Sequence, residues 1–448
     1  MLYSPSSTLS QTSLASSTSA NKSELGSELP IISASPQEPS ASLFRAPSMG
    51  VSPAVESGTH SVDDIFTRAK SHPFYQELLA DTGAFVDCPP TGKNDLRPRI
   101  AEGLKKGLFK GASVYWSPSG GSTGEVPLAQ RFFPCDVAEN KAMRAALAEK
   151  LRAWGMFNKE TTCLNIFPSA PFYQSLSLVN DLGERAGATM IPAGGSASVD
   201  DMIDAIVAFG INTIAGMPGQ VIELAGEINR RGIKTDIRVV VTACSKLHAG
   251  QMQKIEEDVG NTLIFNELYG SAETGVWAFK PSALSGTRDL IVDTDIAYPE
   301  VVDVDEDGVG DILLTNLMRY THPVLRYETG DRGRIHRETV GGSTVTCLEF
   351  HGRHQRSFQY SGDTVELEEF DKVLGNRVGE YQVTIWQEDG RDCVCVDVAN
   401  PASGQDASRL QEALEDAVGF EVELRVMHSN NLVRDRLSRK LKAVVDLR

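Results

Sequence analysis

The sequence predicts an α/β protein: a large N-terminal domain with mainly parallel sheets covered by helices, a β-rich subdomain, and a small α+β C-terminal domain. Three observations support this prediction. Strand-like and helix-like segments alternate between residues 160 and 270, which is typical of parallel strands joined by covering helices. After residue 290 the pattern changes to short alternating strands separated by Gly and Asp turns. Residues 353–448 have a strand and helix pattern of their own.

Composition divides the chain into three segments. Residues 1–58 are rich in Ser, Thr, Pro and Ala and show no sustained apolar period, so they cannot bury enough apolar surface to offset the entropy of ordering. We therefore expect a disordered tail at 1–58, a large domain at 59–352 and a small domain at 353–448. Few basic residues precede Arg45, so an organelle transit peptide is a weaker alternative to a plain tail.

Apolar periodicity and capping residues predict the order of the elements. The pattern becomes helical from Val62, and Asp136 opens an amphipathic helix in which Met143, Leu147 and Leu151 share one face that we expect to be buried. The alternating region then predicts strands at 162–166, 189–192, 213–215 and 238–242, with helices at 176–186, 199–209 and 220–230.

The overall charge and the cysteines limit the function classes. The chain has 448 residues and a formal net charge of -17, which repels nucleic acid and anionic membrane surfaces, so we expect neither as a partner. No apolar run is long enough to span a bilayer, and the seven scattered cysteines suit free thiols, so we expect a cytoplasmic protein. Cys393 and Cys395 are expected on one face of a strand rather than in a metal site.

The segment Val114–Pro127 predicts a phosphate-binding loop after a short strand. Three glycines there let backbone N–H groups converge, and hydroxyl side chains add donors, although a plain flexible connection has the same composition. A nucleotide P-loop is excluded because Glu125 stands where a lysine is required. Residues 120–124 also match a nucleophile elbow with Ser122 as the nucleophile, but residues 125–134 indicate a second strand of a hairpin instead of the required helix.

Three later segments give the loop a context. The stretch 265–275 follows an apolar strand and forms a turn in which Tyr269 offers a stacking ring and Glu273 an oxygen ligand for magnesium. The stretch 325–332 ends a strand with Asp331, which can accept two ribose hydroxyls, and Arg353 stands at the start of the small domain. Residues 303–308 open like a calcium loop, but the required Glu is absent, so a hairpin turn is predicted.

Four motifs in this order resemble the adenylate-forming (acyl-CoA synthetase) superfamily, and most of all its phenylacetate-CoA ligase branch, over roughly residues 88–448. Supporting stretches lie at 93–97, 187–195, 216–219 and 440–446. The resemblance implies that the large domain binds ATP, Mg²⁺ and a carboxylic acid. It also implies that the small domain is a lid that rotates between two half-reactions.

The resemblance further implies roles for individual residues. Lys440 would bridge the substrate carboxylate and the α-phosphate, and Glu273 would hold Mg²⁺. The residues implied in ATP binding are Ser119, Gly121, Ser122, Thr123, Gly124, Tyr269, Gly270, Ser271, Asp331 and Arg353. Candidate walls of the acid pocket are Phe172, Tyr173, Gly194, Gly195, Met217, Gly219 and Trp277, a mixture of aromatic and small residues that suggests an aryl or other compact acid.

The predicted activity is therefore ATP-dependent activation of a carboxylic acid as its acyl-adenylate, with release of pyrophosphate and transfer of the acyl group to coenzyme A. An amine or protein acceptor stays open, because His354, Gln355 and Arg356 replace the acidic hinge common in the family. A Ser122 hydrolase and an inactive nucleotide-binding homologue are the alternatives from other classes. A homodimer also stays open.

Overall fold

The computed structural model describes residues 58–119, 127–169, 172, 174–195, 197–244, 247, 249–285, 287–353, 357–361, 363–375, 377–388, 391–401, 406–434 and 441–448. Over these ranges, eleven strands form one mixed sheet in the order β10-β11-β12-β13-β9-β8-β7-β6-β5-β3-β4. The strands are β3 (Thr162–Asn165), β4 (Thr189–Pro192), β5 (Thr213–Gly216), β6 (Val239–Ala243), β7 (Ile264–Ser271), β8 (Gly275–Lys280), β9 (Asp289–Val292), β10 (Ala297–Val302), β11 (Gly310–Asn316), β12 (Tyr327–Val340) and β13 (Ser343–Arg353).

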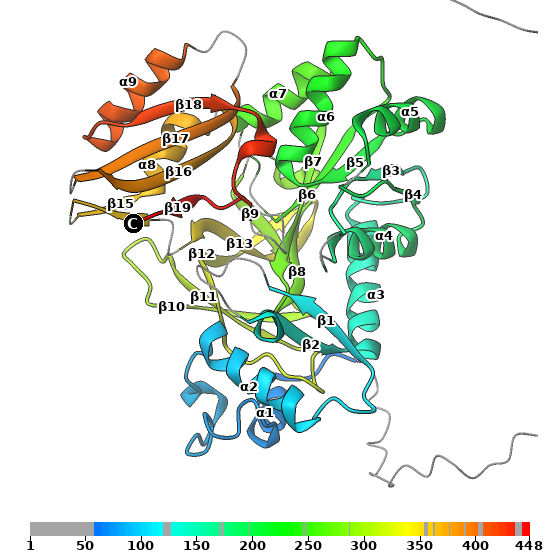
Figure 1. The fold of residues 1–448 in the computed structure, drawn as a ribbon. Coiled ribbons are helices and arrows are strands. Elements are labelled where there is room, and N and C mark those ends of the chain that lie inside the picture. Colours follow the sequence, from blue (N-terminus) through cyan, green and yellow to red (C-terminus); the bar gives the residue numbers. More distant parts are fainter. Residues whose placement is uncertain are drawn as a thin grey trace, which may run out of the picture. The chain divides into compact units, whose positions relative to one another are not determined.

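Strands β3 to β7 run parallel and have helices on both faces, as the alternating pattern predicts. Leu164, Ile214 and Val240 point to one hydrophobic cluster, whereas their chain neighbours Cys163 and Ala215 point to another, because successive side chains alternate across a sheet. Figure 1 shows the two helical layers on either side of these strands. One layer holds α3 (Val137–Ala153) and α4 (Ser175–Arg185), and the other holds α5 (Val199–Phe209), α6 (Pro218–Arg231) and α7 (Ala249–Val259).

Local capping explains where these helices begin and end. The Asp136 carboxylate accepts the N–H groups of Ala138 and Glu139, so α3 starts at the expected residue. Helix α5 has the predicted bounds because the Ser198 hydroxyl caps its first turn and Gly210, at φ 58°, ends it in the left-handed conformation. The apolar face predicted for α3 is confirmed: Met143, Leu147 and Leu151 are all buried.

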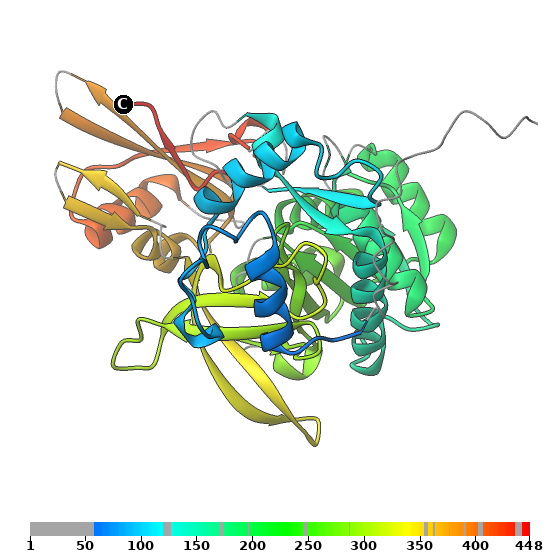
Figure 2. The same ribbon diagram turned by 90° about the horizontal axis from the view of Figure 1, so that it is seen from below.

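Strands β8 to β13 pair antiparallel, and β8 pairs with β7 at the edge of the parallel half. The predicted β-rich part therefore belongs to the same sheet as the parallel strands. The hairpin turn predicted at 303–308 is confirmed, because β10 and β11 flank it and the Asp305 carboxylate accepts the N–H groups of Asp307 and Val309. In Figure 2 the β12–β13 hairpin, coloured yellow, extends away from the other strands.

The hairpin expected around the phosphate loop exists with a shorter second strand. Strand β1 (Val114–Pro118) pairs antiparallel with β2 (Phe132–Asp136), but residues Leu128–Arg131 form a 3-10 helix. The prediction of a strand over 125–134 was therefore wrong at Leu128–Arg131, where Pro127 directly before the 3-10 helix has no N–H for a strand ladder. Residues 125 and 126 lie outside the described residues.

Two helices precede this hairpin and pack in a cluster of their own. Helix α1 (Val62–Ser71) begins with a capping box between Ser61 and Asp64, and α2 (Lys93–Lys106) begins after Gly92. Ile65, Leu96 and Ile100 are buried in this cluster together with residues 324–327, which lead into β12. The contact places the N-terminal turn of α2 beside the start of β12.

The C-terminal segment has its own sheet and core. Over the described residues the strand order is β18-β17-β16-β19, and helices α8 and α9 bury Phe370, Leu410 and Leu414 against it. Cys393 and Cys395 lie on β17 as expected, and they are free thiols, as are Cys88, Cys135, Cys163 and Cys347. The elements are β14 (Ser357–Tyr360), β15 (Asp363–Glu366), α8 (Leu367–Leu374), β16 (Val378–Glu388), β17 (Arg391–Pro401), α9 (Ala407–Val418), β18 (Glu423–Met427) and β19 (Val444–Asp446).

Among the helices in the described ranges, none combines the length and apolar character needed to cross a bilayer.

Candidate active site

Glu273 lies in a tight turn between β7 and β8. The sequence predicted that the whole stretch 265–275 is a turn after a strand, but β7 extends to Ser271 and only residues 272–274 form the turn. Tyr269 and Gly270 are therefore strand residues. A Cβ on Gly270 would lie 2.1 Å from the Gly275 carbonyl oxygen, and Gly275 has φ 75°, so both positions require glycine to close the turn.

The Glu273 carboxylate is buried among cationic and hydroxyl groups. Its Oε1 lies 3.1 Å from Lys93 Nζ and accepts a hydrogen bond from the Ser119 hydroxyl. Burial by itself would raise the pKa of Glu273, but the Lys93 ammonium and the Ser119 hydroxyl outweigh it and hold the pKa at about 2. Glu273 is therefore a charged oxygen donor at neutral pH, although only 2% of it is exposed.

Buried side chains of the antiparallel half hold the Glu273 turn in place. The Arg319 guanidinium donates a hydrogen bond to the Glu273 carbonyl oxygen, and the Asn316 amide donates to the Thr274 carbonyl oxygen at 2.7 Å. The Ser271 and Thr274 side chains exchange hydrogen bonds with each other's backbone N–H groups across the turn. Because Arg319 and Asn316 are themselves buried, the position of the carboxylate is fixed by packing rather than by solvent-exposed contacts.

Tyr269 and Asp331 form a second polar contact beside this turn. The Tyr269 hydroxyl donates to Asp331 Oδ2 at 2.6 Å, and the Tyr269 ring packs against Trp277 and Phe350 with centroid distances of 5.1 and 5.4 Å. Asp331 was expected at the end of a strand, but it is the fifth residue of β12, which continues to Val340. The backbone of Arg353 lies directly opposite Asp331 in the β12–β13 ladder, so the two predicted ribose-binding positions are neighbours.

Helix α2 contributes two basic residues for which the sequence predicted no role. Lys93 and Arg97 are four residues apart on one helical face, and Arg97 is 6% exposed. The Nε and Nη2 atoms of Arg97 have no hydrogen-bond partner among the described residues. A buried guanidinium with unpaired N–H groups is costly unless an anion satisfies them, so Arg97 is a candidate anion ligand. The spacing of two basic residues around an apolar helix face was the signal available in the sequence.

Several predicted residues lie outside the described part of the chain. These are Gly121, Ser122, Thr123, Gly124, Tyr173 and Lys440, as well as the hinge residues 354–356. Of the Gly/Ser-rich part of the phosphate loop, the structure describes Ser119, whose hydroxyl donates a hydrogen bond to Glu273.

The candidate acid-pocket residues fall into two environments. Met217 and Trp277 are buried in the same hydrophobic cluster, and Tyr269 packs against that cluster. Gly195 lies against Pro168 and Gln220, and Gly219 lies in the first turn of α6. Phe172, in contrast, is 59% exposed and has φ 63°, while Gly194 has φ 69° beside Leu176. Among the described pocket candidates, Met217 and Trp277 are therefore buried, whereas Phe172 is mostly exposed.

Known proteins resemble this chain in sequence and in fold, although no family model matches it. A phenylacetate-coenzyme A ligase of Thermus thermophilus is 24% identical over 396 residues, which cover 83% of this chain and 85% of that protein. A phenylacetate-coenzyme A ligase of Pseudomonas putida is 24% identical over 282 residues, which cover 59% of this chain and 62% of that protein. The chain thus matches less than two thirds of the length of the Pseudomonas relative.

Among solved structures, 2-hydroxyisobutyryl-CoA ligase in complex with 2-HIB-AMP, in the postadenylation state, has a TM-score of 0.66. The match has 16% identity and covers 89% of this chain and 94% of that chain. The same ligase with 2-HIB-AMP and CoA, in the thioesterification state, has a TM-score of 0.55 at 17% identity and covers 86% of this chain and 88% of that chain. These two likenesses confirm the predicted fold class.

The comparisons also confirm the resemblance that the motifs indicate. The chain is similar in sequence to two adenylate-forming ligases, both named as phenylacetate-coenzyme A ligases. This is the branch that the motifs resemble most.

Proposed function

We propose that the protein is an ATP-dependent acid–CoA ligase that activates a compact or aryl carboxylic acid as its acyl-adenylate and transfers the acyl group to coenzyme A. The observation that carries this proposal is the turn at Glu273: a buried, ionised carboxylate beside Ser119 of the Gly/Ser-rich loop and Lys93 of α2. The relatives named as phenylacetate-coenzyme A ligases support the same activity.

The residues around Glu273 fit a magnesium nucleotide. A carboxylate with a pKa of about 2 is a hard oxygen donor of the kind that Mg²⁺ prefers. When bound, Mg²⁺ would neutralise charge on the phosphate oxygens during attack by the acid. Arg97 offers unpaired N–H groups that suit an anionic phosphate, and Ser119 would position the phosphate loop against Glu273.

The nucleoside would be held on the opposite side of the same turn. Asp331 accepts a hydrogen bond from the Tyr269 hydroxyl through Oδ2, and this contact would orient the carboxylate for binding ribose hydroxyls. The Tyr269 ring, supported by Trp277 and Phe350, provides a flat surface beside which adenine would lie. Lys440 would bring its charge to the reacting carboxylate and the α-phosphate, as the resemblance implies.

A hydrolase with Ser122 as its nucleophile is less well supported than the ligase. The nucleophile elbow requires an α-helix directly after the serine. From residue 127 onward the described chain forms a 3-10 helix at Leu128–Arg131 and then the antiparallel strand β2. A cytoplasmic location and a homodimer remain predictions from the sequence.

The test is pyrophosphate release with ATP, Mg²⁺ and a panel of aryl and short-chain acids, followed by mass spectrometry of the products with and without coenzyme A. We expect acid-dependent pyrophosphate release and a coenzyme A thioester, with both lost in Glu273→Gln. The matched control is Glu267→Gln, which changes a partly buried carboxylate of β7 that lies 4.0 Å from Lys280. Ester hydrolysis without ATP would instead support the Ser122 alternative. An acyl-adenylate that coenzyme A does not consume would support an amine or protein acceptor.

A further inference from the structure

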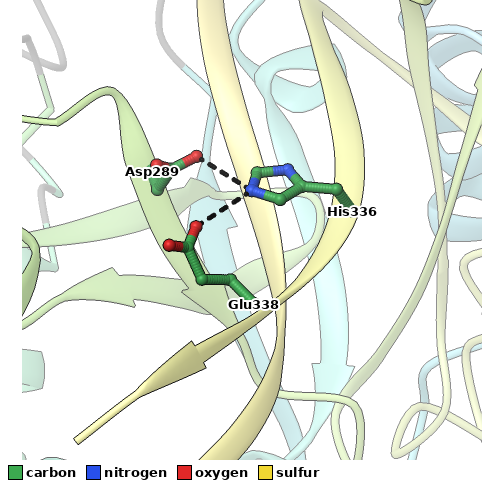
Figure 3. Close-up of side chains that lie close together, drawn as sticks. All are labelled: Asp289, His336 and Glu338. Atoms are coloured by element: carbon green, nitrogen blue, oxygen red, sulfur yellow. Dashed lines mark hydrogen bonds and ion pairs between the residues drawn. The ribbon is translucent and has the colours of Figure 1, made fainter.

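We propose that Asp289, His336 and Glu338 form a binding site for a first-row transition-metal dication, with Zn²⁺ as the ion of choice. Asp289 begins β9, whereas His336 and Glu338 lie on β12, and one ligand atom from each residue lies within 4.8 Å of the other two. Figure 3 shows the imidazole of His336 directed between the two carboxylates. Histidine nitrogen combined with carboxylate oxygen is a donor set that suits zinc.

The strand register explains how side chains from two non-adjacent strands meet. Strand β13 lies between β12 and β9, and Cys347 on β13 is the direct partner of both His336 and Ile291. Asp289 is two residues from Ile291, so it projects from the same face of the sheet as His336. Because Cys347 has a small side chain, the longer side chains of His336 and Asp289 can meet above it.

The distances favour a metal ion over a simple ion pair. His336 Nε2 lies 3.6 Å from Asp289 Oδ1 and 3.4 Å from Glu338 Oε2. A charge-assisted hydrogen bond to a carboxylate has a length of roughly 2.7–2.9 Å, so neither contact has contracted to that value. Two ligand atoms bound tetrahedrally to zinc at about 2.0–2.2 Å are separated by roughly 3.3–3.6 Å, which matches both observed separations.

The surrounding charges leave the three ligands available. Arg334 and His351 on the same sheet are paired with Glu349, at 2.6 and 3.0 Å. Lys280 on β8 interacts with Asp289, but its ammonium also lies 4.0 Å from Glu267 and donates to the Thr287 carbonyl oxygen. Asp289 Oδ1 accepts no hydrogen bond from any described residue. The carboxylates of Asp289 and Glu338 therefore face His336, and Asp289 shares the nearby Lys280 ammonium with Glu267. A dication would compensate the negative charge of the two carboxylates.

Burial suggests how tightly the ion would bind. The side chains of Asp289 and His336 are 15% and 29% exposed, whereas Glu338 is 50% exposed, so an ion can enter from the Glu338 side. Three protein ligands leave one tetrahedral position for water. His336 Nδ1 has no hydrogen-bond acceptor among the described residues, and a missing second-shell partner weakens metal affinity by about 10–100-fold. We therefore expect micromolar rather than nanomolar affinity.

The site is distinct from the candidate active site. His336 is five residues along β12 from Asp331, which corresponds to roughly 16 Å of extended strand. The ion would connect β12 to β9 across β13 and so stabilise the long β12–β13 hairpin. Its removal should lower the stability of the sheet without abolishing pyrophosphate release.

The experiment uses the full-length, tag-free protein, stripped with a chelator and titrated with Zn²⁺ by calorimetry. Visible absorption with Co²⁺ then reports the coordination geometry. We expect one equivalent of Zn²⁺, tetrahedral Co²⁺ bands, and no displacement by excess Mg²⁺, which prefers octahedral oxygen ligands. His336→Gln and Glu338→Gln should each weaken binding at least about tenfold. His351→Gln is the matched control, because His351 is a similarly exposed histidine paired with a single carboxylate, and it should bind Zn²⁺ like the wild type.

Two results would overturn the proposal. One is the absence of stoichiometric Zn²⁺ binding by protein that circular dichroism shows to be folded. The other is binding that His336→Gln and Glu338→Gln leave unchanged, which would assign the ion to other groups such as the cysteines. A metal-free contact of His336 with the two carboxylates would give the first result, together with a stability that does not depend on chelator. Glu338→Gln keeps the test valid if His336→Gln fails to fold, because Glu338 is half exposed.

Discussion

Replacing Lys93 with methionine removes the cation beside Glu273 and keeps most of the side-chain length. In the folded protein the pKa of Glu273 is about 2 instead of the ordinary 4.5, with Lys93 the largest of the interactions that lower it. A difference of that size corresponds to about 3 kcal/mol of stabilisation at neutral pH, at 1.36 kcal/mol per pKa unit. Loss of one partner of a buried ion pair typically costs about 3–5 kcal/mol, which agrees in magnitude. We therefore expect Lys93→Met to lower the melting temperature at pH 7 by several degrees.

The pH dependence distinguishes this explanation from a packing defect. A carboxylate with a depressed pKa stabilises the fold above its unfolded pKa of 4.5, and this stabilisation is lost as the pH falls from about 4.5 toward 2. In Lys93→Met, burial dominates and raises the pKa of Glu273, so the carboxylate takes up a proton at a higher pH. Once it is protonated, Glu273 no longer carries the free-energy cost of a buried, unpaired charge. The stability difference between variant and wild type should therefore shrink between pH 7 and pH 4.5.

The assay is thermal unfolding of both proteins at several pH values. The control is Lys106→Met in the same helix, which removes an exposed pair with Glu102 and should leave the melting temperature unchanged. A Lys93→Met protein that melts like the wild type at pH 7, or a deficit that stays constant down to pH 4.5, would refute the reasoning.

Three further predictions concern other parts of the chain. Lys440→Ala should severely reduce pyrophosphate release while leaving the melting temperature intact; release within about threefold of wild type at saturating acid contradicts the role assigned to it. Burial holds the pKa of His72 at about 3 and that of His322 at about 4, whereas both accept protons near 6.5 when unfolded. Each histidine should thus cost about 2 kcal/mol of stability between pH 7 and pH 5. In urea unfolding, His72→Gln should lose less stability between pH 7 and pH 5 than the wild type does. An equal loss in the two proteins would argue against the contribution assigned to His72. Deletion of residues 1–55 should leave activity and melting temperature nearly unchanged, and a loss of several degrees would show that the tail packs on the body.

The fold was predictable where local signals agree with burial. Helix α5 matches its predicted bounds, because Ser198 and Gly210 mark its ends and the apolar residues between them repeat at the helical period. The prediction failed where two local signals compete. Phe132 and Phe133 favour a strand and Pro127 opposes one, and only the pairing of β2 with β1 decides that the strand begins at Phe132.

Tyr269, Glu273 and Asp331 were singled out from the sequence one by one, but their contacts and the roles of Lys93 and Arg97 were not. The Tyr269–Asp331 hydrogen bond joins positions 62 residues apart, and the Ser119–Glu273 contact joins positions 154 residues apart. Such pairs depend on how β7, β12 and the β1–β2 hairpin pack together, and apolar periodicity contains no information about that packing. The resemblance named those residues because family motifs record tertiary contacts indirectly.

Lys93 shows how tertiary packing gives a residue a role that was not assigned to it from the sequence. On the sequence it is one charged residue at the start of a helix, where solvated lysines are common. In the fold, the cluster that packs α2 against the start of β12 brings its ammonium to a carboxylate that is 2% exposed. A buried carboxylate without a cation would tend to take up a proton and lose its value as a metal ligand. We therefore expect Lys93 to keep Glu273 ionised before the nucleotide arrives, so the stability deficit and the activity deficit of Lys93→Met should share one pH dependence.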